Sequence, residues 1–490
     1  MTVIAIVESR ADRASTHICD ALRDCVDWDE HEDETRLDAD GGGTWYRTDG
    51  FELRSFDDIH LELEAPVDAF DCDPDLLVFA SRHAGDTGAL LTGHFTGNFG
   101  PAEFGGENEA LAEACPNALA VLREAFEEYA PSEYDVGLEC THHGPTDVGC
   151  PSLFAELGSS DEQWDDPAGA EAVARAILAL RGTEPHRETQ LVGFGGNHYV
   201  PRFERIVRET PWAVGHVGAD WALEAMGEPD SDSDPDPDPD SDSETEAHRD
   251  VIDRAFTASE ADIAVVDDDR PALEAVIEDL GYRVVSETWV RAVGDRPLEA
   301  VDRVESQLGE VDDGVRFGDR REASFALVEL PEELIGTAEG IDPDRVRGVL
   351  ETHAIAFETT NGGSRIGARA AVPTGTGSEG EAEDGDGGHN AESLAAVDDL
   401  AAALADVLRE KYDDVRLETP TSASETDAIV AREVAFDPQL AAELGVPEGP
   451  KFGALADGES VTVDGETISP DDVRTERRHR FSLPRRLEGE

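Results

Sequence analysis

Lysine is almost missing from this chain. Lys411 and Lys451 are the only lysines among 490 residues, and the 39 basic residues face 112 acidic ones, which gives a net charge of −73. At about 0.15 M salt, exposed charges are screened beyond roughly 8 Å, and near 1 M beyond roughly 3 Å. Self-repulsion on this scale is best tolerated at high ionic strength. The composition therefore indicates a halophilic protein of a salt-rich cytoplasm, and the scarcity of basic patches does not argue against a nucleic-acid substrate.

Long apolar runs are also missing. No stretch approaches the roughly 18 apolar residues of a membrane span, and no leading apolar segment resembles a signal peptide. We therefore expect a cytoplasmic protein without membrane contact. The six cysteines all lie in the first third of the chain without C-x-x-C spacing, which indicates reduced thiols and disfavours a disulfide framework. The glycine-rich segments have neither P-loop nor Rossmann spacing, which disfavours a nucleotide cofactor.

Short apolar runs that alternate with amphipathic helical patterns predict an α/β fold, with a mixed central sheet, flanking helices and a second, smaller α/β module. Residues 1–228 should form a first domain. An acidic, low-complexity segment, 229–247, should be a disordered linker. Residues 248–295 have a β-α-β pattern and should return to complete the first domain. Residues 296–490 should form the second module, which is interrupted by an acidic loop at 375–390.

One stretch, 139–146, gathers unusual chemistry. It reads Glu-Cys-Thr-His-His-Gly-Pro-Thr. Its first two residues end the segment 134–140, in which apolar and polar residues alternate as in a strand. Glu139 should leave the sheet on the face opposite Cys140, and His142 and His143 should lie on the exit loop. Ligands of open α/β sheets bind at the carboxyl ends of the strands, so a site is expected here.

Histidine recurs at the ends of predicted strands. Five such ends carry the imidazoles of His83, His94, His142 with His143, His198 and His216. We expect these rings to converge on one pocket with Glu139, where neutral imidazoles and a carboxylate would suit zinc and a bound water of lowered pKa. Which three or four groups bind the metal is left open by the spacing. His83 or His94 could instead be a general base or a core histidine.

These motifs resemble one family. Ser81-Arg82-His83, the segment 91–98 (LTGHFTGN), the segment 139–146 and the segment 195–202 (GGNHYVPR) are similar to the archaeal and plant type of D-aminoacyl-tRNA deacylase, over about residues 1–293. The resemblance implies zinc dependence, a fold like that of peptidyl-tRNA hydrolase and nucleoside phosphorylases, and hydrolysis of the ester between a D-amino acid and tRNA. Residues 296–490 lie beyond the short members of that family.

The motifs and the resemblance together define the candidate site. The catalytic candidates are His142, His143, Glu139, His83 and His198. The zinc candidates are His94, His142, His143, His198, His216 and Glu139. The substrate-binding candidates are Arg10, Arg82, Asn98, Gly195, Gly196, Tyr199 and Arg202, where the arginines would contact phosphates and the Gly195 and Gly196 amides would meet a developing oxyanion. Attack assisted by the ribose 2′-hydroxyl is the alternative to a protein base.

Two rival functions remain at this stage. One is an enzyme of another class on a similar fold, a peptidyl-tRNA hydrolase or a nucleoside phosphorylase. The other is a non-catalytic tRNA-binding protein in which the histidines hold a structural metal. The expected partner is the acceptor end of tRNA charged with D-amino acids. No protein partner is inferred, and a monomer is expected.

Overall fold

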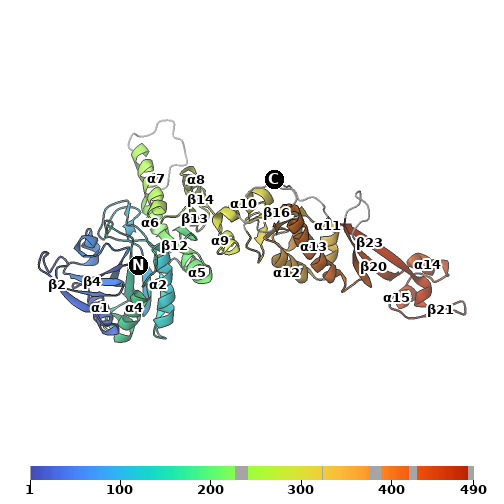
Figure 1. Ribbon diagram of the computed structural model, residues 1–490, viewed down its shortest axis with the longest axis horizontal. Helices are drawn as coiled ribbons and strands as arrows, with labels where there is room; N and C mark the ends of the chain where they lie inside the picture. Colours follow the sequence, from blue (N-terminus) through green and yellow to red (C-terminus); the bar gives the residue numbers. More distant parts are fainter. Residues whose placement is uncertain (1, 227–240, 323, 375–387, 419–426, 484–490) are drawn as a thin grey trace. The chain divides into compact units, whose positions relative to one another are not determined.

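The computed structural model describes residues 2–226, 241–322, 324–374, 388–418 and 427–483 (Figure 1). The chain divides into two compact units, Met1–Asp295 and Arg296–Glu490. Each unit has its own hydrophobic core. The histidine-bearing motifs all lie in the first unit.

An eight-stranded mixed sheet forms the centre of the first unit. Its strands run, in spatial order, β2 (Asp29–Asp33), β3 (Gly43–Thr48), β4 (Phe51–Phe56), β1 (Ile4–Ser9), β5 (Leu76–Arg82), β10 (Ser152–Gly158), β6 (Leu90–His94) and β9 (Asp135–Leu138). The β4-β1-β5-β10 block is parallel, and β6 turns the direction because it pairs antiparallel to β10. The α/β class with a mixed central sheet is thereby confirmed.

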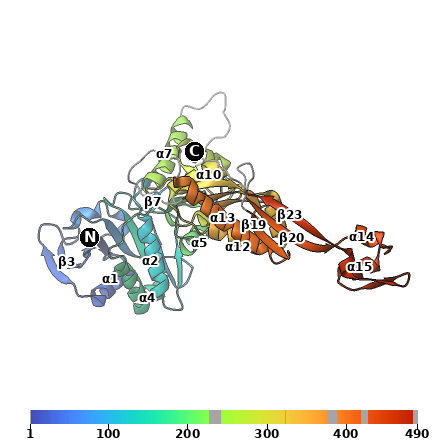
Figure 2. The ribbon, with the colours of Figure 1, turned by 45° about the vertical axis from the view of Figure 1, so that its right-hand side comes forward.

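Both faces of this sheet are covered. Helices α1 (Arg13–Cys25), α4 (Pro167–Ala179) and α2 (Pro116–Tyr129) pack side by side along one face (Figures 1 and 2). The central strands β1 and β5 are almost entirely buried, as expected of parallel strands. Smaller elements complete the layers: η1 (His60–Glu62), η2 (Pro66–Ala69), β7 (Gly97–Asn98), β8 (Ala110–Leu111) and α3 (Asp161–Trp164).

The first unit also contains a second sheet, in which all strands are parallel. Its order is β12 (Ala213–Gly218), β11 (Gln190–Phe194), β13 (Ile263–Val266) and β14 (Arg283–Val284). The helices around it are α5 (Pro201–Glu209), α6 (Asp220–Met226), α7 (Ser241–Thr257), α8 (Pro271–Asp279) and α9 (Glu287–Val293). The segment 248–295 therefore extends the sheet that begins at residue 190, because β13 pairs with β11.

The described part of the second unit contains two larger antiparallel sheets and a two-stranded one, β21 (Val461–Val463) with β22 (Glu466–Ile468). The first is ordered β15 (Val315–Phe317), β17 (Ala356–Thr360), β18 (Arg365–Pro373), β16 (Phe325–Glu329), and the second β19 (Asp414–Glu418), β20 (Ala428–Phe436), β23 (Arg474–Ser482). The helices α10 (Leu298–Leu308), α11 (Glu332–Glu339), α12 (Pro343–His353) and α13 (Gly388–Leu408) belong to it. Between β20 and β23 the chain forms α14 (Pro438–Glu443), α15 (Pro450–Ala456), β21, β22 and η3 (Pro470–Val473).

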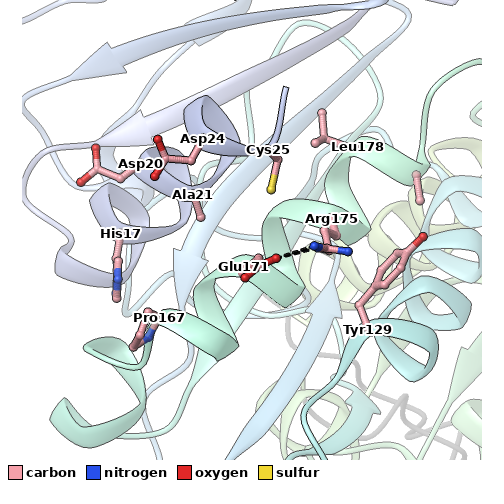
Figure 3. Close-up of a pocket in the computed structure, with 11 residues that line it drawn as sticks. His17, Asp20, Ala21, Asp24, Cys25, Tyr129, Pro167, Glu171, Arg175 and Leu178 are labelled. Atoms are coloured by element: carbon pink, nitrogen blue, oxygen red, sulfur yellow. Dashed lines mark hydrogen bonds and ion pairs between the residues drawn. The ribbon is translucent and has the colours of Figure 1, made fainter. Parts of the chain in front are cut away.

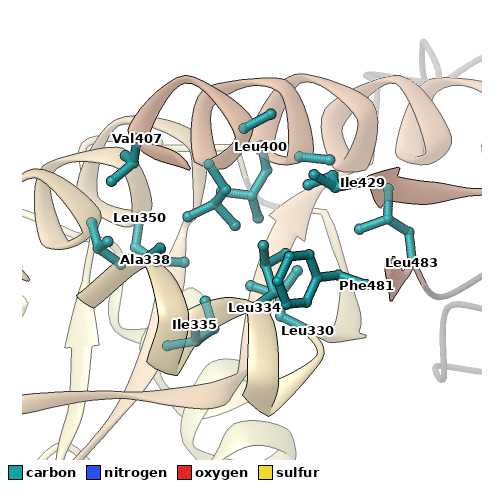
Figure 4. Packing of buried hydrophobic residues seen from close by; sticks show 14 of the residues in the cluster. Leu330, Leu334, Ile335, Ala338, Leu350, Leu400, Val407, Ile429, Phe481 and Leu483 are labelled. Atoms are coloured by element: carbon teal, nitrogen blue, oxygen red, sulfur yellow. The ribbon is translucent and has the colours of Figure 1, made fainter. Parts of the chain in front are cut away.

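Figure 4 shows the main core of the second unit. Leu400 from α13, Leu350 from α12 and Leu334 from α11 meet Phe481 from β23, and all four side chains are at most 4% exposed. The core thus joins the helices to the three-stranded sheet.

Two predicted boundaries are wrong. Helix α7 begins at Ser241, within the segment 229–247 that the sequence analysis assigned to a disordered linker, and α13 begins at Gly388, within the predicted loop 375–390. Helix α7 begins with the acidic and hydroxyl-bearing residues that are common in the first turn of a helix, so composition alone did not separate linker from helix there. Residues 229–240 and 375–387 lie outside the described residues.

A buried ionic cluster sits within the acidic first unit. The fully buried guanidinium of Arg54 donates to Glu52 (2.9 Å), Asp33 (3.0 Å) and Asp71 (3.1 Å), while Arg47, which is 44% exposed, donates to the same Glu52 at 2.6 Å. Removing one partner of a buried ion pair leaves a buried charge without compensation. Arg54 therefore holds three carboxylates that would otherwise repel one another.

Substitution at the two arginines tests this role. Arg54→Leu should lower the free energy of unfolding by about 3–5 kcal/mol because Glu52 then loses its buried partner. Arg47→Leu should lower it by less than about 1 kcal/mol because Arg47 is itself partly exposed and Glu52 keeps its buried partner Arg54. Denaturant unfolding of both variants at fixed high salt measures the difference, and equal losses would contradict the buried role of Arg54.

Candidate functional site

The loop after β9 joins the two sheets of the first unit. The Cys140 N–H donates to the carbonyl oxygen of His198 (2.9 Å), and the Thr141 N–H donates to the carbonyl oxygen of Val217 (2.9 Å). Both acceptors belong to the second sheet or its loops. His142 and His143 follow directly, and His143 has a positive φ of 49° that turns the chain there. The loop is thus fixed by its main chain, which positions the side chains that follow.

Three imidazoles share one hydrogen-bonding arrangement. The Nδ1–H of His94 donates to the carbonyl of Phe95 (3.0 Å), that of His142 to Cys140 (2.9 Å) and that of His143 to Gly144 (2.7 Å). Because a carbonyl accepts but cannot donate, each ring carries its proton on Nδ1 and a lone pair on Nε2. The ring centroids lie 4.2–4.9 Å apart. The three lone pairs are therefore held close together.

Burial keeps two of these rings neutral. It is the main cause that holds the pKa of His142 well below its ordinary value and lowers the pKa of His143 to about 4, and the charge of neighbouring His94 adds to it. Burial also opposes the charged form of His94, but the carboxylate of Glu156 outweighs it and raises the pKa of His94. His94 Nε2 is buried, makes no hydrogen bond and lies 3.5 Å from the carboxylate of Glu156, so a cation bound at this nitrogen would take the place of the proton that Glu156 favours.

The carboxylate of Glu139 is the hub of the site. It is 4% exposed. It accepts from His198 Nε2 at 2.7 Å, lies 3.1 Å from His83 Nδ1, and lies 3.7 Å from His142 Nε2. Although burial opposes ionisation, the bonds from His198 and His83 hold the pKa of Glu139 well below its usual range. Glu139 is therefore an anion that orients His198 and His83 and lies close to His142.

A second buried carboxylate, Glu156, escaped the sequence analysis. It lies in β10, is 3% exposed, and approaches His83 Nδ1 (3.6 Å) and His94 Nε2 (3.5 Å). The available signal was a lone glutamate in the otherwise apolar strand SLFAELG, because a buried carboxylate needs a partner. Burial opposes protonation of His83, but Glu139 and Glu156 together raise its pKa to about 10. His83 is thus an imidazolium at neutral pH.

His216 does not join the cluster, and its assignment as a metal ligand is not supported by its contacts. It lies within β12, where its Nε2–H donates to the carbonyl of Ala112 (2.8 Å) and its Nδ1 accepts from the hydroxyl of Thr141 (2.9 Å). Both nitrogens are therefore occupied. Burial lowers the pKa of His216 to about 4, so the ring is a neutral, satisfied core histidine.

The predicted oxyanion donors are also occupied. The Gly195 N–H donates to the carbonyl of Gly218 (2.8 Å), and the Gly196 N–H donates to the side chain of Asp220 (2.8 Å). Both glycines have positive φ, 99° and 86°, so their conformational freedom serves the turn that leads to His198. These two amides are not available to a substrate oxyanion.

Three predicted substrate contacts are used within the protein. Arg10 pairs with Asp38 (3.0 Å) and Asp57 (2.7 Å), and Arg202 pairs with Asp267 (2.8 Å). Asn98 donates its amide hydrogens to the carbonyl oxygens of Gly105 (3.0 Å) and Glu107 (3.1 Å). Sequence could not show these partners because they come from distant segments.

Two predicted substrate contacts stay near the cluster. The Tyr199 hydroxyl lies 3.4 Å from His83 Nε2. Arg82, the last residue of β5, has an exposed side chain. Its guanidinium lies 5.2 Å from the centre of the Trp164 ring. Trp164 in turn donates its indole N–H to the carbonyl of His83 (2.9 Å). Tyr199 and Arg82 therefore remain candidates for substrate contacts.

Cys140 is unsuited to nucleophilic attack. Burial, with the charge of Glu139 beside it, raises the pKa of its thiol to about 12. The thiolate is the nucleophilic form, so this cysteine stays protonated. It lies 3.6 Å from His198 Nδ1.

The described residues contain three groups that could hold a metal ion, each with its ligand atoms within 4.8 Å of one another. They are His94 with His142 and His143, Cys140 with His142 and His198, and His83 with Glu139 and Glu156. The first fits a zinc-like cation best, because its rings are fixed through Nδ1 to carbonyls, which is the usual outer-shell arrangement of metal-bound histidine. The second group shares His142 with the first, and its His198 is engaged by Glu139, while His83 in the third group is paired with both carboxylates.

One cavity lies away from the histidine cluster. It is a groove of about 870 Å³ between α1 and α4, where Arg175 bonds to Glu171 and faces Cys25 and Tyr129 (Figure 3). None of its lining residues belongs to the histidine cluster. The chemistry is therefore located by the convergence of side chains and not by cavity size.

The site combines an ionised carboxylate with neutral imidazoles at the strand ends of an α/β fold. Such a combination is typical of hydrolases that can use a metal ion. Residues 70–285 match the sequence pattern of the D-aminoacyl-tRNA deacylase family. The chain is 51% identical to a D-aminoacyl-tRNA deacylase of Halorubrum lacusprofundi, over 98% of this chain and 97% of that one. A D-aminoacyl-tRNA deacylase of Natronomonas pharaonis is also 51% identical, over 98% of this chain and 100% of that one. The chain therefore belongs to the D-aminoacyl-tRNA deacylase family, and it is a hydrolase.

More distant relatives extend this result. A D-aminoacyl-tRNA deacylase of Methanoregula boonei is 30% identical over 98% of both chains, so the second unit is matched as well. The fold also resembles the crystal structure of a conserved protein of unknown function, AF0625, with 27% sequence identity and a TM-score of 0.51. The matched region covers 59% of this chain and 97% of AF0625. Within the described segments, no helix is both long and apolar enough to cross a membrane.

Two histidine variants separate a ligand from a core residue. His142→Ala should lower the bound metal per chain by about tenfold or more at limiting metal while the circular dichroism spectrum stays unchanged. His216→Ala should retain the metal but lower the midpoint of denaturant unfolding, because the Thr141 hydroxyl and the Ala112 carbonyl lose their buried partner. Elemental analysis and unfolding curves provide the readouts. Metal loss in His216→Ala with an intact fold would overturn the distinction.

His83 should make the stability of the metal-free protein depend on pH. Its pKa is raised from 6.5 to about 10 on folding, so its stabilising contribution is fully present below pH 6.5 and is lost as the pH rises through about 10. The difference in unfolding free energy between the parent protein and His83→Gln should therefore shrink over that range. A difference that is constant with pH would show that the two carboxylates do not hold the proton on His83.

Proposed function

We propose that this chain hydrolyses the ester bond between a D-amino acid and tRNA, releasing the free D-amino acid and uncharged tRNA, in a salt-rich cytoplasm. The observation that carries the proposal is the set of His94, His142 and His143, whose Nδ1–H groups all donate to main-chain carbonyls and leave three Nε2 lone pairs together. The family relationship supports the same reaction.

Zn²⁺ is the proposed cofactor, with His94, His142 and His143 as its ligands. Three neutral imidazoles are a typical ligand set for catalytic zinc. When bound, the ion would polarise the ester carbonyl and lower the pKa of a water molecule. The position of His94 Nε2 supports this assignment: it is buried, makes no hydrogen bond and lies 3.5 Å from the carboxylate of Glu156, whose negative charge would also stabilise a cation bound there.

His198 is the proposed general base. Its Nε2–H donates to Glu139 at 2.7 Å, so its basic lone pair is on Nδ1, and the ring is 34% exposed and open to solvent and substrate. Cys140 lies 3.6 Å from Nδ1, and a thiol is only a weak donor, so it competes little with water. Glu139 orients the ring and stabilises the imidazolium that forms when Nδ1 takes a proton.

His83 is the proposed general acid. It is held as an imidazolium between Glu139 and Glu156, and its Nε2–H points toward the Tyr199 hydroxyl at 3.4 Å. A proton on this nitrogen can pass to the ribose oxygen as the ester bond breaks. Arg82 and Tyr199 are the proposed substrate contacts at this end of the site. We expect a monomer.

Hydrolysis of D-Tyr-tRNA and L-Tyr-tRNA in molar KCl, with and without a chelator, tests the proposal. The parent protein should deacylate the D substrate preferentially, and chelation should abolish the activity. Glu139→Gln should lower kcat by about 10²–10⁴-fold, because a neutral amide cannot stabilise the His198 imidazolium.

Glu128→Gln is the matched control, since Glu128 is exposed on α2, and it should retain the parent rate. Phosphate-dependent release of a base, or preferential cleavage of N-acylated tRNA, would replace the proposed reaction with one of the rival enzyme classes. Persistent D-Tyr-tRNA hydrolysis in fully metal-free protein would remove zinc from the proposal.

A further inference from the structure

Two exposed aromatic rings stand at the histidine cluster. The large apolar side chains that the described chain exposes are Leu37, Phe104, Trp221, Leu417, Val434 and Leu444. Phe104 (65% exposed) and Trp221 (50%) are the aromatic ones among them. Scattered exposed apolar residues need no explanation. Here, however, both rings are on segments that contact the cluster directly.

Trp221 lies on the His198 side. It is the second residue of α6, and its indole contacts the Cys140 thiol, which in turn lies 3.6 Å from His198 Nδ1. The preceding residue, Asp220, accepts the Gly196 N–H (2.8 Å) in the turn that leads to His198. The same short turn therefore fixes both the proposed base and the exposed indole.

Phe104 lies on the His143 side. Its carbonyl oxygen accepts the N–H of Gly144 at 2.9 Å, and the carbonyl of Gly144 accepts the Nδ1–H of His143. The segment that carries Phe104 is held by Asn98, which donates to the carbonyls of Gly105 and Glu107. The ring is thus presented by a fixed loop, on the residue whose own carbonyl oxygen contacts the 139–146 segment.

Charge disfavours the usual way to bind RNA at this site. The chain carries a net charge of −73, and the nearby guanidinium groups of Arg10 and Arg202 are paired with carboxylates. Phosphate contacts also weaken steeply as salt rises. Stacking of bases on aromatic rings needs no charge, and unpaired RNA ends are commonly held in this way.

We propose that Trp221, with Phe104 as a second ring, forms a stacking platform for the unpaired bases at the 3′ end of tRNA, with the terminal adenine on Trp221. The inference rests on the proposed function, because it assigns the nucleic-acid side of the same substrate. Trp221 is a substrate-binding residue here, and it takes no part in proton transfer. The platform would place the terminal ribose ester beside His198 and His83.

Two small substrates isolate the base. D-tyrosyl adenosine contains the terminal nucleoside, and D-tyrosine ethyl ester lacks it. For the full-length, metal-loaded protein in molar KCl, the preference for the adenosyl ester, measured as the ratio of the two kcat/KM values, should fall about tenfold in Trp221→Ala. The loss should lie in KM for the adenosyl ester, Trp221→Phe should restore most of the preference, and Phe104→Leu should show a smaller fall.

Leu37→Ala is the matched control, because Leu37 is 71% exposed in the same unit and should keep the full preference. An unchanged preference in Trp221→Ala would overturn the platform. Equal losses on both esters would also overturn it, since the ring would then hold the amino acid or support the fold.

Fluorescence titration with the trinucleotide CCA tests the platform without catalysis. The parent protein should show quenching that Trp221→Phe lacks, because a stacked base quenches the indole. This outcome separates the two proposals: quenching without any ester hydrolysis would reject the proposed function and retain the platform, and hydrolysis without quenching would do the reverse.

Discussion

The site depends on one buried anion. Glu139 lies almost without exposure at the end of β9, and its carboxylate receives His198 and His83 while lying near His142. A buried carboxylate is stable only if it is paired or hydrogen-bonded, so these imidazoles and Glu139 hold one another in place. In the proposed mechanism, His83 and His198, which contact Glu139, carry or receive protons, whereas His94, His142 and His143, whose Nδ1–H groups donate to main-chain carbonyls, would hold the cation. Proton-transfer groups and cation ligands can therefore coexist within a few ångströms.

Local sequence signals were sufficient for much of the fold and for part of the site. Alternation before Glu139 and the apolar run 76–80 predicted β9 and β5, and histidines at such ends predicted that His83, His94, His142, His143 and His198 would meet. His216 shares the pattern but differs in its partners, the hydroxyl of Thr141 and the carbonyl of Ala112. Those contacts span 75 and 104 residues, and no local pattern encodes them.

Polar groups were harder to assign than apolar ones because a polar group may serve either a ligand or the protein itself. The amides of Gly195 and Gly196 and the guanidinium of Arg202 have the right chemistry for a substrate, yet each is consumed by a neighbour from another segment. Glu156 shows the opposite case. A single acidic residue within an apolar strand gave little pattern to read, although its burial against His83 and His94 makes it part of the site. The acidity of the whole chain made such a residue inconspicuous.

The two main-chain hydrogen bonds from Cys140 and Thr141 have a consequence for how the first unit can be divided. They fasten the active loop to β12 and to the turn after β11, and β11 is flanked on its other side by β13, which arrives only at residue 263. A polypeptide that stopped before β13 would leave β11 with an open edge and a mobile His198. The smallest independently working piece of this enzyme must therefore include both β11 and β13, which stand before and after the acidic segment in the sequence.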